Sequence, residues 1–424
     1  MDFKQQLLMG LPVLLAPILI DLGVGALRRK PAYRASDLVT NLTLSLLTLL
    51  ASVGIAGATL WLYTAAHQHF GLLPLAPGAA WTWLLAFLAY DFLYYWAHRA
   101  HHRMAWLWAI HVVHHSGEDM NFGLAVRQSA LGELTTWPFF LPMALLGIPP
   151  EAYLGATALQ LVFQYSIHNT YVPPLGWLER VLVTPSQHRV HHSRNRLYID
   201  KNYGNVLVLW DWLFGSYQPE VPEQPPVYGI RHSPRTWNPL TLHVHALVEL
   251  LQKAAACERW LDKARCVLRP PDWEPPSLRR ERFPGLADDG PSATFRKYEA
   301  RLAPAPTAYC VSQFLALAAS IVLLIWKLEA LSAPAVAAAC ALVLWSAWTL
   351  GTLLDARPGA WRLELVRLAA VALFGLASTL PAGLALPFAL PFLLYAALSG
   401  AFLLRVRAAF QEALPSGGPG ALAT

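Results

Sequence analysis

Apolar runs of about 20 residues, each long enough to cross a lipid bilayer, recur along this chain. They constrain the fold most strongly, because a helix satisfies its backbone hydrogen bonds internally where no water is present. Only 14% of the 424 residues are charged, whereas about a quarter are charged in a typical soluble domain. The sequence therefore excludes a soluble enzyme and predicts an all-α, polytopic transmembrane helical bundle.

Nine membrane spans are predicted from these runs. The two segments on either side of Pro149-Pro150 form either two spans or a hairpin. The predicted spans are Leu7–Ala26, Leu38–Tyr63, Trp81–Ala97, Leu131–Ile148, Tyr153–Ile167, Ala308–Leu328, Ala333–Leu353, Leu363–Leu380 and Leu384–Leu404.

Basic residues gather in every second loop between these spans. The formal net charge is +6, from 32 Lys+Arg against 26 Asp+Glu. Because cytoplasmic loops of membrane proteins are enriched in Lys and Arg, we expect the basic loops on the cytoplasmic side and the amino terminus outside. The charge is thus interpreted as a topology signal, and no nucleic-acid partner is expected. Abundant Ala and Arg favour a bacterial inner membrane; in a eukaryote the expected membrane is the endoplasmic reticulum.

Four regions follow from composition. Residues 1–80 are predicted to be amino-terminal transmembrane helices, and residues 81–250 a histidine-rich catalytic domain. Residues 251–307, rich in Pro and charge, are predicted to be a cytoplasmic linker. Residues 308–424 are predicted to be carboxy-terminal transmembrane helices. The four cysteines show no paired spacing and are expected to be reduced thiols.

Three histidine clusters distinguish the second region. They are H98-R-A-H-H102, H111-V-V-H-H115 and H188-R-V-H-H192. Positions i, i+3 and i+4 share one face of a helix, so the second and third clusters are each expected to aim three imidazoles at a single point, and His98 and His102 of the first cluster to aim two. A lone cluster fits a pH-sensitive interfacial helix as well as a metal site, but three on one side of the membrane favour metal. The predicted ligands are His98, His102, His111, His114, His115, His188, His191 and His192.

All-imidazole coordination suits iron, zinc or copper. A zinc hydrolase needs about three ligands and a Glu base, and no HExxH occurs here. Eight nitrogen ligands suit a pair of irons that activates dioxygen, since one ion takes about four to six. We therefore expect a membrane oxygenase with a cytoplasmic helical cap that holds a di-iron site.

Further polar residues are expected to support the metals. Gln160, Gln164 and His168 are spaced by four on one span, and a polar stripe in lipid is costly and usually functional. His168 is a candidate ninth ligand or a hydrogen-bond donor to one. Asp91 lies two turns before His98, and we expect it to orient a ligand imidazole. His101 lies off the i, i+4 register and is expected to be a neighbour of the ligands.

The histidine pattern resembles the fatty acid hydroxylase/sterol desaturase superfamily and, within it, the alkylglycerol monooxygenases. The resemblance runs from about Asp91 to His245. It is carried by HHSGEDMN at 114–121, AVRQS at 125–129, IHNT at 167–170, TPSQHRVHHSRNR at 184–196, IDKNYG at 199–204, LWDWLFG at 209–215 and VYG at 227–229.

This resemblance implies hydroxylation of the ether carbon of an alkylglycerol by dioxygen, iron and tetrahydrobiopterin. The hemiacetal product would collapse to a fatty aldehyde and a glycerol derivative. Glu118, Asp119, Arg127 and Gln128 would then line the cytoplasmic mouth, where a pterin or polar head group docks, and Glu118 would also act in catalysis. The animal enzymes carry an acidic residue directly after the first cluster, where this chain has Arg103.

Two alternatives remain open at the level of sequence. The first is a hydroxylase or desaturase of a fatty acyl chain, sterol or carotenoid, because the histidine clusters are shared across the superfamily. Its electrons would come from a separate ferredoxin or cytochrome instead of a pterin. The second is a metal transporter, which would place its ligands at mid-membrane on several spans and not in loops at one face.

Overall fold

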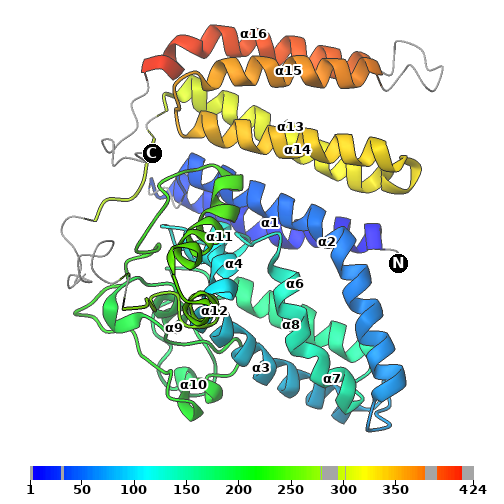
Figure 1. Cartoon of the computed structure of the whole chain (residues 1–424), viewed down its shortest axis with the longest axis vertical. Coiled ribbons are helices and arrows are strands. Elements are labelled where there is room, and N and C mark those ends of the chain that lie inside the picture. The colour runs from blue at the N-terminus through cyan, green and yellow to red at the C-terminus, as the bar shows by residue number, and fades with distance from the viewer. Residues whose placement is uncertain are drawn as a thin grey trace.

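The chain folds almost entirely into helices (Figure 1). The computed structural model describes residues 3–29, 33–276, 278, 295–300, 302–377 and 389–412. Isolated bridges join Leu182 with Leu207 and Ser193 with Tyr228. The predicted all-α class is confirmed.

The first half of the chain carries two long amino-terminal helices and the longer helices of the histidine-rich region. They are α1 (Phe3–Leu27), α2 (Ala35–Phe70), α3 (Ala80–Arg103), α4 (Ala105–His115) and α8 (Pro150–Ser166). Short helices fill the connections: α5 (Phe122–Ala125), α6 (Gly132–Thr136), η1 (Trp137–Phe140), α7 (Leu141–Leu146), η2 (Gly176–Arg180), α9 (Pro185–His191), η3 (Arg196–Tyr198) and α10 (Leu209–Leu213).

The second half begins with two amphipathic helices, α11 (Pro239–Ala256) and α12 (Trp260–Leu268). Long apolar helices follow: α13 (Pro304–Lys327) with its 3-10 extension η4 (Leu328–Ala330), α14 (Ala333–Leu354), α15 (Ala360–Ala377) and α16 (Leu390–Glu412). Residues 279–294 of the predicted linker, and residues 378–380 and 384–388 of the last two predicted spans, lie outside the described residues.

Four described helices are long and apolar enough to cross a membrane: α2, α13 with η4, α14 and α16. In α1, a shorter apolar stretch runs over Leu14–Leu27. Helices α1, α3, α8 and α15 occupy four more of the nine predicted spans. Together these helices make the chain an integral membrane protein.

The predicted span Leu131–Ile148 is wrong as a single helix. The chain there breaks into α6, η1 and α7, because Pro138 and Pro142 each begin a new helix and Gly147, at φ +94°, ends the last one. These short helices pack against α2 and α3, and α8 follows them directly.

The carboxy-terminal helices stack on the rest of the molecule in layers (Figure 1). The pair α15–α16 lies on the pair α13–α14, and α13 packs against α2. A buried apolar cluster runs through this contact and includes Leu47, Ile321, Ala347 and Leu403. The carboxy-terminal helices are therefore joined to the histidine-rich region by packing as well as by the linker.

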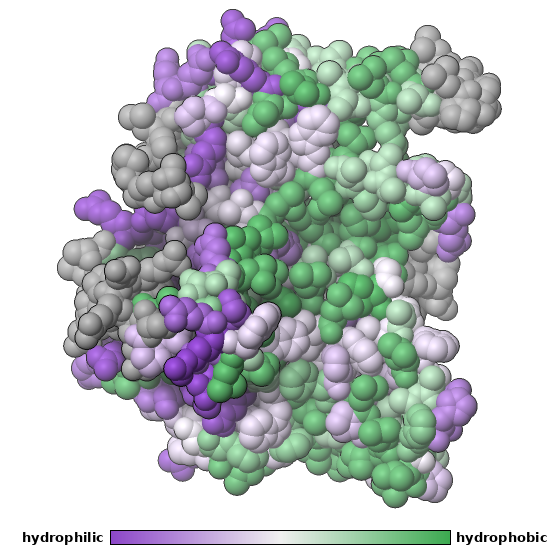
Figure 2. Space-filling view, viewed as in Figure 1, coloured by the Kyte–Doolittle hydropathy of each residue, from purple (hydrophilic) through white to green (hydrophobic). Residues whose placement is uncertain are grey.

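Polar and apolar surfaces lie on different sides of the molecule. Figure 2 shows hydrophobic side chains gathered over the right-hand part of this face, where the long helices run, and hydrophilic ones toward the left. In Figure 1 the left side carries α9, α10 and α12 with their loops. This division is typical of a protein whose helices lie in lipid while one end meets water.

Candidate metal centre

Nine histidine side chains gather in two groups at this end of the molecule. The five-histidine group consists of His98, His102, His111, His115 and His191. The four-histidine group consists of His114, His168, His188 and His192. Within each group the ring nitrogens lie within 4.8 Å of one another, which is close enough to hold one metal ion. All nine are histidines that the sequence predicts as ligands or candidate ligands, and their binding of metal stays a prediction.

The expectation that the second and third clusters each aim three rings at a single point is wrong. His111 and His115 on α4 enter the five-histidine group, while His114 enters the other group. On α9, His188 joins the four-histidine group and His191 does not. Consecutive helical residues are rotated by about 100° from each other, so neighbouring histidines such as His114 and His115 face different points. The second and third clusters therefore each contribute to both groups.

Backbone carbonyl groups hold the outer nitrogen of four of these rings. Nδ1 of His98 donates to the Tyr203 carbonyl at 2.9 Å, and Nδ1 of His191 donates to the Lys201 carbonyl at 2.9 Å. The same contact joins His114 to the Arg127 carbonyl at 3.0 Å and His168 to the Gln164 carbonyl at 2.7 Å. Because a carbonyl only accepts hydrogen bonds, Nδ1 carries the proton, and a neutral ring then presents its Nε2 lone pair to the group.

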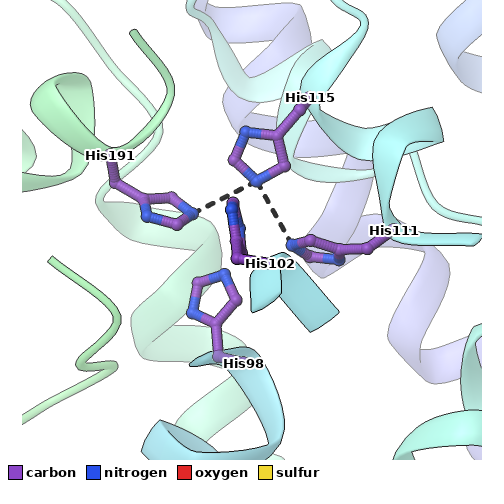
Figure 3. Close-up of side chains that lie close together, drawn as sticks. All are labelled: His98, His102, His111, His115 and His191. Atoms are coloured by element: carbon purple, nitrogen blue, oxygen red, sulfur yellow. Dashed lines mark hydrogen bonds between the residues drawn. The ribbon is translucent and has the colours of Figure 1, made fainter. Parts of the chain in front are cut away.

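The inner nitrogens face one another across a short gap (Figure 3). Nε2 of His115 lies 3.2 Å from Nε2 of both His111 and His191. In the other group, Nε2 of His188 lies 2.9 Å from that of His168 and 3.1 Å from that of His192. Nε2 of His114 lies 3.3 Å from Nε2 of His168. Because Nδ1 of each of these two rings donates to a carbonyl, two lone pairs face each other there, and they repel unless a cation lies between them.

Two further nitrogens make the fit to a metal specific. Nε2 of His98 and Nε2 of His102 are buried and have no hydrogen-bond partner among the described residues. A buried polar atom without a partner is costly, and both atoms belong to the five-histidine group. The residues present therefore suit a bound cation with nitrogen ligands.

Burial keeps these rings in the form that binds metal. Burial lowers the pKa of His191 to about 4, partly opposed by its bond to the Lys201 carbonyl. Burial likewise lowers the pKa of His168 to about 3. Both rings are neutral at pH 7, and a neutral imidazole is the metal-binding form.

The fatty acid hydroxylase family model matches residues 83–216, which contain all nine histidines. Alkylglycerol monooxygenase from Homo sapiens is 34% identical to this chain, covering 84% of the chain and 79% of the human protein. The Danio rerio enzyme is 34% identical, covering 89% of the chain and 84% of that protein. Ornithine lipid hydroxylase OlsE from Rhizobium tropici is 30% identical over 36% of the chain and 45% of that protein. No solved structure matches the chain.

The chain belongs to the alkylglycerol monooxygenase family. It is a membrane lipid monooxygenase, and thus an oxidoreductase that acts on a lipid with dioxygen. The two histidine groups and the hydroxylase family together indicate iron as the metal.

In this monooxygenase, Asp91 does not orient an imidazole as expected. Its carboxylate accepts hydrogen bonds from the Val206 and Leu207 N–H groups, at 3.0 and 3.2 Å, and from the Trp210 indole at 2.9 Å. Asp91 therefore holds the loop at 201–207 whose carbonyl groups orient the rings. Asp91 lies two helical turns before His98, as predicted, but its carboxylate is occupied by hydrogen bonds from this loop and from Trp210.

Asp211 holds the same loop from the other side. It accepts hydrogen bonds from the N–H groups of Tyr203 and Gly204 at 2.7 and 2.8 Å, and from the Ser216 hydroxyl at 2.7 Å. Tyr203 is the residue whose carbonyl binds His98. Asp211 is thus linked to His98 of the centre through a single residue, Tyr203.

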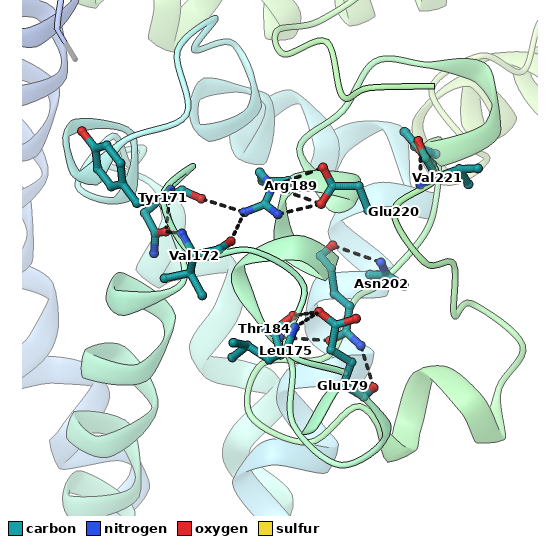
Figure 4. A network of polar contacts seen from close by, with 12 residues as sticks. Tyr171, Val172, Leu175, Glu179, Thr184, Arg189, Asn202, Glu220 and Val221 are labelled. Carbon is teal, nitrogen blue, oxygen red and sulfur yellow. Dashed lines mark hydrogen bonds and ion pairs between the residues drawn. The ribbon is translucent and has the colours of Figure 1, made fainter. Parts of the chain in front are cut away.

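The helix that carries the third histidine cluster is fixed by residues that sequence reasoning missed (Figure 4). Arg189 is buried, pairs with Glu220 at 2.7 Å, and donates to the Val172 carbonyl at 2.9 Å. At the start of α9, Thr184 and Gln187 form a capping box, and the Glu179 carboxylate accepts from the Thr184 hydroxyl at 2.8 Å. The signal in the sequence is the TPSQ run, a helix-start pattern.

The four predicted mouth residues do not line an open mouth. Arg127 is 2% exposed, and its guanidinium donates to the Val113 carbonyl, the Asn41 amide oxygen and the Ser116 hydroxyl. Gln128 reaches inward, with its amide nitrogen 3.3 Å from Nδ1 of His114. Arg127 therefore braces the end of α4, which carries the second histidine cluster.

The other two, Glu118 and Asp119, are covered by a returning segment of the chain. Glu118 is buried and accepts a hydrogen bond from the Tyr298 N–H at 2.6 Å. Asp119 pairs with Arg34 at 2.6 Å and with Lys297 at 2.5 Å. A direct role in catalysis or cofactor binding for either carboxylate stays a prediction.

The remaining histidines near the centre lie outside both groups. His101 contacts the Ala97 carbonyl and the Thr135 hydroxyl, in line with its expected place beside the ligands. His243 accepts from the Ala130 N–H at 3.0 Å.

Arg103, which follows the first cluster, pairs with Asp200 at 2.5 Å. All four cysteines are free thiols, as expected.

Proposed function

We propose that this protein hydroxylates the ether carbon of an alkylglycerol lipid, with one iron held by each histidine group. The substrate ether is R–CH2–O–R′. One oxygen atom of dioxygen enters the C–H bond to give R–CH(OH)–O–R′, and the other leaves as water with two protons and two electrons from the reductant. The hemiacetal then collapses to a fatty aldehyde and the free glycerol hydroxyl.

The metal assignment is supported by the donor set. Bound iron would supply the activation of dioxygen that an unreactive C–H bond requires. The chain's own part is to hold the neutral imidazoles with their Nε2 atoms turned inward, four of them through backbone carbonyls such as those of Tyr203, Lys201 and Arg127. Neutral ligands leave the positive charge of the metals uncompensated, which favours oxidising chemistry.

The ether-lipid substrate is supported by the reach of the sequence similarity. The alkylglycerol monooxygenases match 84% and 89% of this chain, whereas the ornithine lipid hydroxylase matches 36%. This extended match is the single observation that favours an alkylglycerol over other lipids of the superfamily.

For the reductant we propose tetrahydrobiopterin, again from similarity to the alkylglycerol monooxygenases, with a ferredoxin or cytochrome as the alternative. We further propose that the metal centre faces the cytoplasm, because the loops around it are the ones rich in Arg. A lipid substrate would enter sideways from the membrane, since its tail is already there.

Product analysis by mass spectrometry tests this function. Iron-loaded protein would be given an alkylglycerol and dioxygen, with and without tetrahydrobiopterin. We expect fatty aldehyde only when the pterin is present. An iron-containing protein that yields no aldehyde, but hydroxylates an acyl or sterol lipid with a ferredoxin, would overturn the proposal.

A further inference from the structure

Helix α12 exposes an apolar stripe. Trp260, Leu261 and Leu268 are 84%, 60% and 56% exposed, and Ala264 between them is exposed as well. The positions 260, 261, 264 and 268 lie along one side of a helix. The opposite side buries Cys266 against Cys257 at the end of α11, with the two sulfur atoms 3.4 Å apart. The stripe thus points away from the molecule.

Basic side chains border this stripe. Arg259, Arg265 and Arg269 are exposed, and Arg265 makes an exposed pair with Asp262 at 3.2 Å. Lys263 lies over the Trp260 ring and donates to carbonyl groups at the end of α11. An apolar stripe that carries a tryptophan between arginines is the pattern of a helix that lies in the surface of a membrane.

The orientation of α12 agrees with that pattern. In Figure 1 the long helices α13–α16 run across the picture, whereas α12 is seen nearly end-on. Helices that cross a bilayer run close to its normal, so α12 lies roughly parallel to the plane of the membrane. It also lies toward the side of the molecule on which hydrophilic side chains gather (Figure 2).

We propose that α12 rests on the membrane that the chain spans and binds its anionic lipid headgroups. Trp260, Leu261 and Leu268 enter the boundary between headgroups and acyl chains. Arg265 and Arg269 contact lipid phosphates. The occupant of this face is therefore the anionic headgroup layer, and the positive charge of the border complements it.

This contact reaches the metal centre through α4. The Ala105 N–H at the start of α4 donates to the Arg269 carbonyl at 2.9 Å, and both α12 and α11 pack against α4. Helix α4 carries His111, His114 and His115. Resting α12 on the headgroups thus sets the distance between the histidine groups and the headgroup layer. Only this consequence rests on the proposed function, since an ether carbon lies close beneath the headgroup.

A depth measurement on the full-length protein tests the contact without any assay of activity. A spin label at Leu261→Cys, in a Cys340→Ser background, is examined in nanodiscs of phosphatidylcholine with and without phosphatidylglycerol. We expect oxygen, which concentrates in lipid, to relax the label more than a water-soluble nickel chelate does, and the difference to grow with phosphatidylglycerol. A matched label at Glu223→Cys, an exposed loop position, should stay accessible to nickel in both.

Charge variants separate lipid binding from packing. The double variant Arg265→Gln/Arg269→Gln should lose the dependence on phosphatidylglycerol, while Arg265→Lys/Arg269→Lys should retain it. A label at 261 that nickel relaxes as strongly as at 223 would contradict the proposal, because the stripe would then lie in water. Shielding of the label from both reagents would also overturn it, since protein would cover the face.

Discussion

The Tyr203 carbonyl accepts a hydrogen bond from Nδ1 of His98 at 2.9 Å, across 105 residues of chain. The N–H of the same tyrosine donates to Asp211 at 2.7 Å. One residue thereby joins a buried carboxylate to a ring of the five-histidine group. The backbone thus orients the four rings whose Nδ1 meets a carbonyl. The carboxylates Asp91 and Asp211 fix the loop that supplies two of those carbonyls, for His98 and His191.

Replacing Asp211 by Asn should weaken metal binding without removing a ligand. An amide has one acceptor oxygen, so it cannot accept from the Tyr203 and Gly204 N–H groups and from Ser216 as the carboxylate does. Loss of such a supporting contact typically costs about 10–100-fold in metal affinity. Competition with an iron chelator measures the change. Glu223→Gln, on an exposed loop, should leave the affinity unchanged, and an equal loss in both variants would refute the role of Asp211.

The first histidine cluster offers two neighbouring positions with different expected outcomes. His102 belongs to the five-histidine group, whereas His101 contacts Thr135 and the Ala97 carbonyl. His102→Ala should lose iron and turnover, while His101→Ala should retain iron and show at most a modest loss of stability. Iron content and aldehyde formation, measured on both purified variants, check this. Loss of iron in His101→Ala alone would reverse the assignment.

Arg189→Ala should destabilise the fold around α9. The guanidinium is buried and binds both Glu220 and the Val172 carbonyl. Removing one partner of a buried pair costs about 3–5 kcal/mol, and somewhat less here because Glu220 is 20% exposed. We expect a melting temperature lower by several degrees. The melting temperature of Arg189→Lys should lie between those of the native protein and Arg189→Ala, since an ammonium cannot make the forked contact. An unchanged melting temperature in Arg189→Ala would argue against this role of Arg189.

Stability of the metal-free protein should fall as the pH drops. The pKa values of His191 and His168 are lowered to about 4 and about 3 in the folded chain, against about 6.5 for an unfolded histidine. Between these values the unfolded chain binds more protons, so the free energy of unfolding decreases as pH decreases. Melting of chelator-treated protein should therefore shift down steadily from about pH 7 to about pH 5. A shift upward over this range would contradict the burial of neutral rings.

The sequence was sufficient to predict which histidines gather at the centre, but not how they divide into two groups. His98 and His102, or His111 and His115, are recognisable as pairs because i, i+4 spacing places them one turn apart. The assignment of His114 and His191 to opposite groups depends on how α4 and α9 are rotated against each other. That rotation depends on tertiary contacts of each helix, such as that of Arg189 on α9 with Glu220, which the sequence does not specify.

Helix breaks and local partners account for the other differences. The hydropathy of Leu131–Ile148 predicts one span. In the structure Pro138 and Pro142 each lie in the first turn of a new short helix, so the segment is broken. Asp91 has the spacing of a residue that supports His98, yet the Val206 and Leu207 N–H groups occupy its carboxylate. Neither loop position could be placed beside α3 from sequence alone, because more than 100 residues separate them.

Iron stoichiometry tests the central claim most directly. The native protein, reconstituted under anaerobic conditions and freed of loose metal, should contain two iron ions per chain. His115→Ala, from the five-histidine group, and His192→Ala, from the four-histidine group, should each retain less iron than the native chain while His101→Ala retains all of it. A native protein that saturates at one iron, or variants of both groups that keep the full complement, would contradict a centre built from two histidine groups.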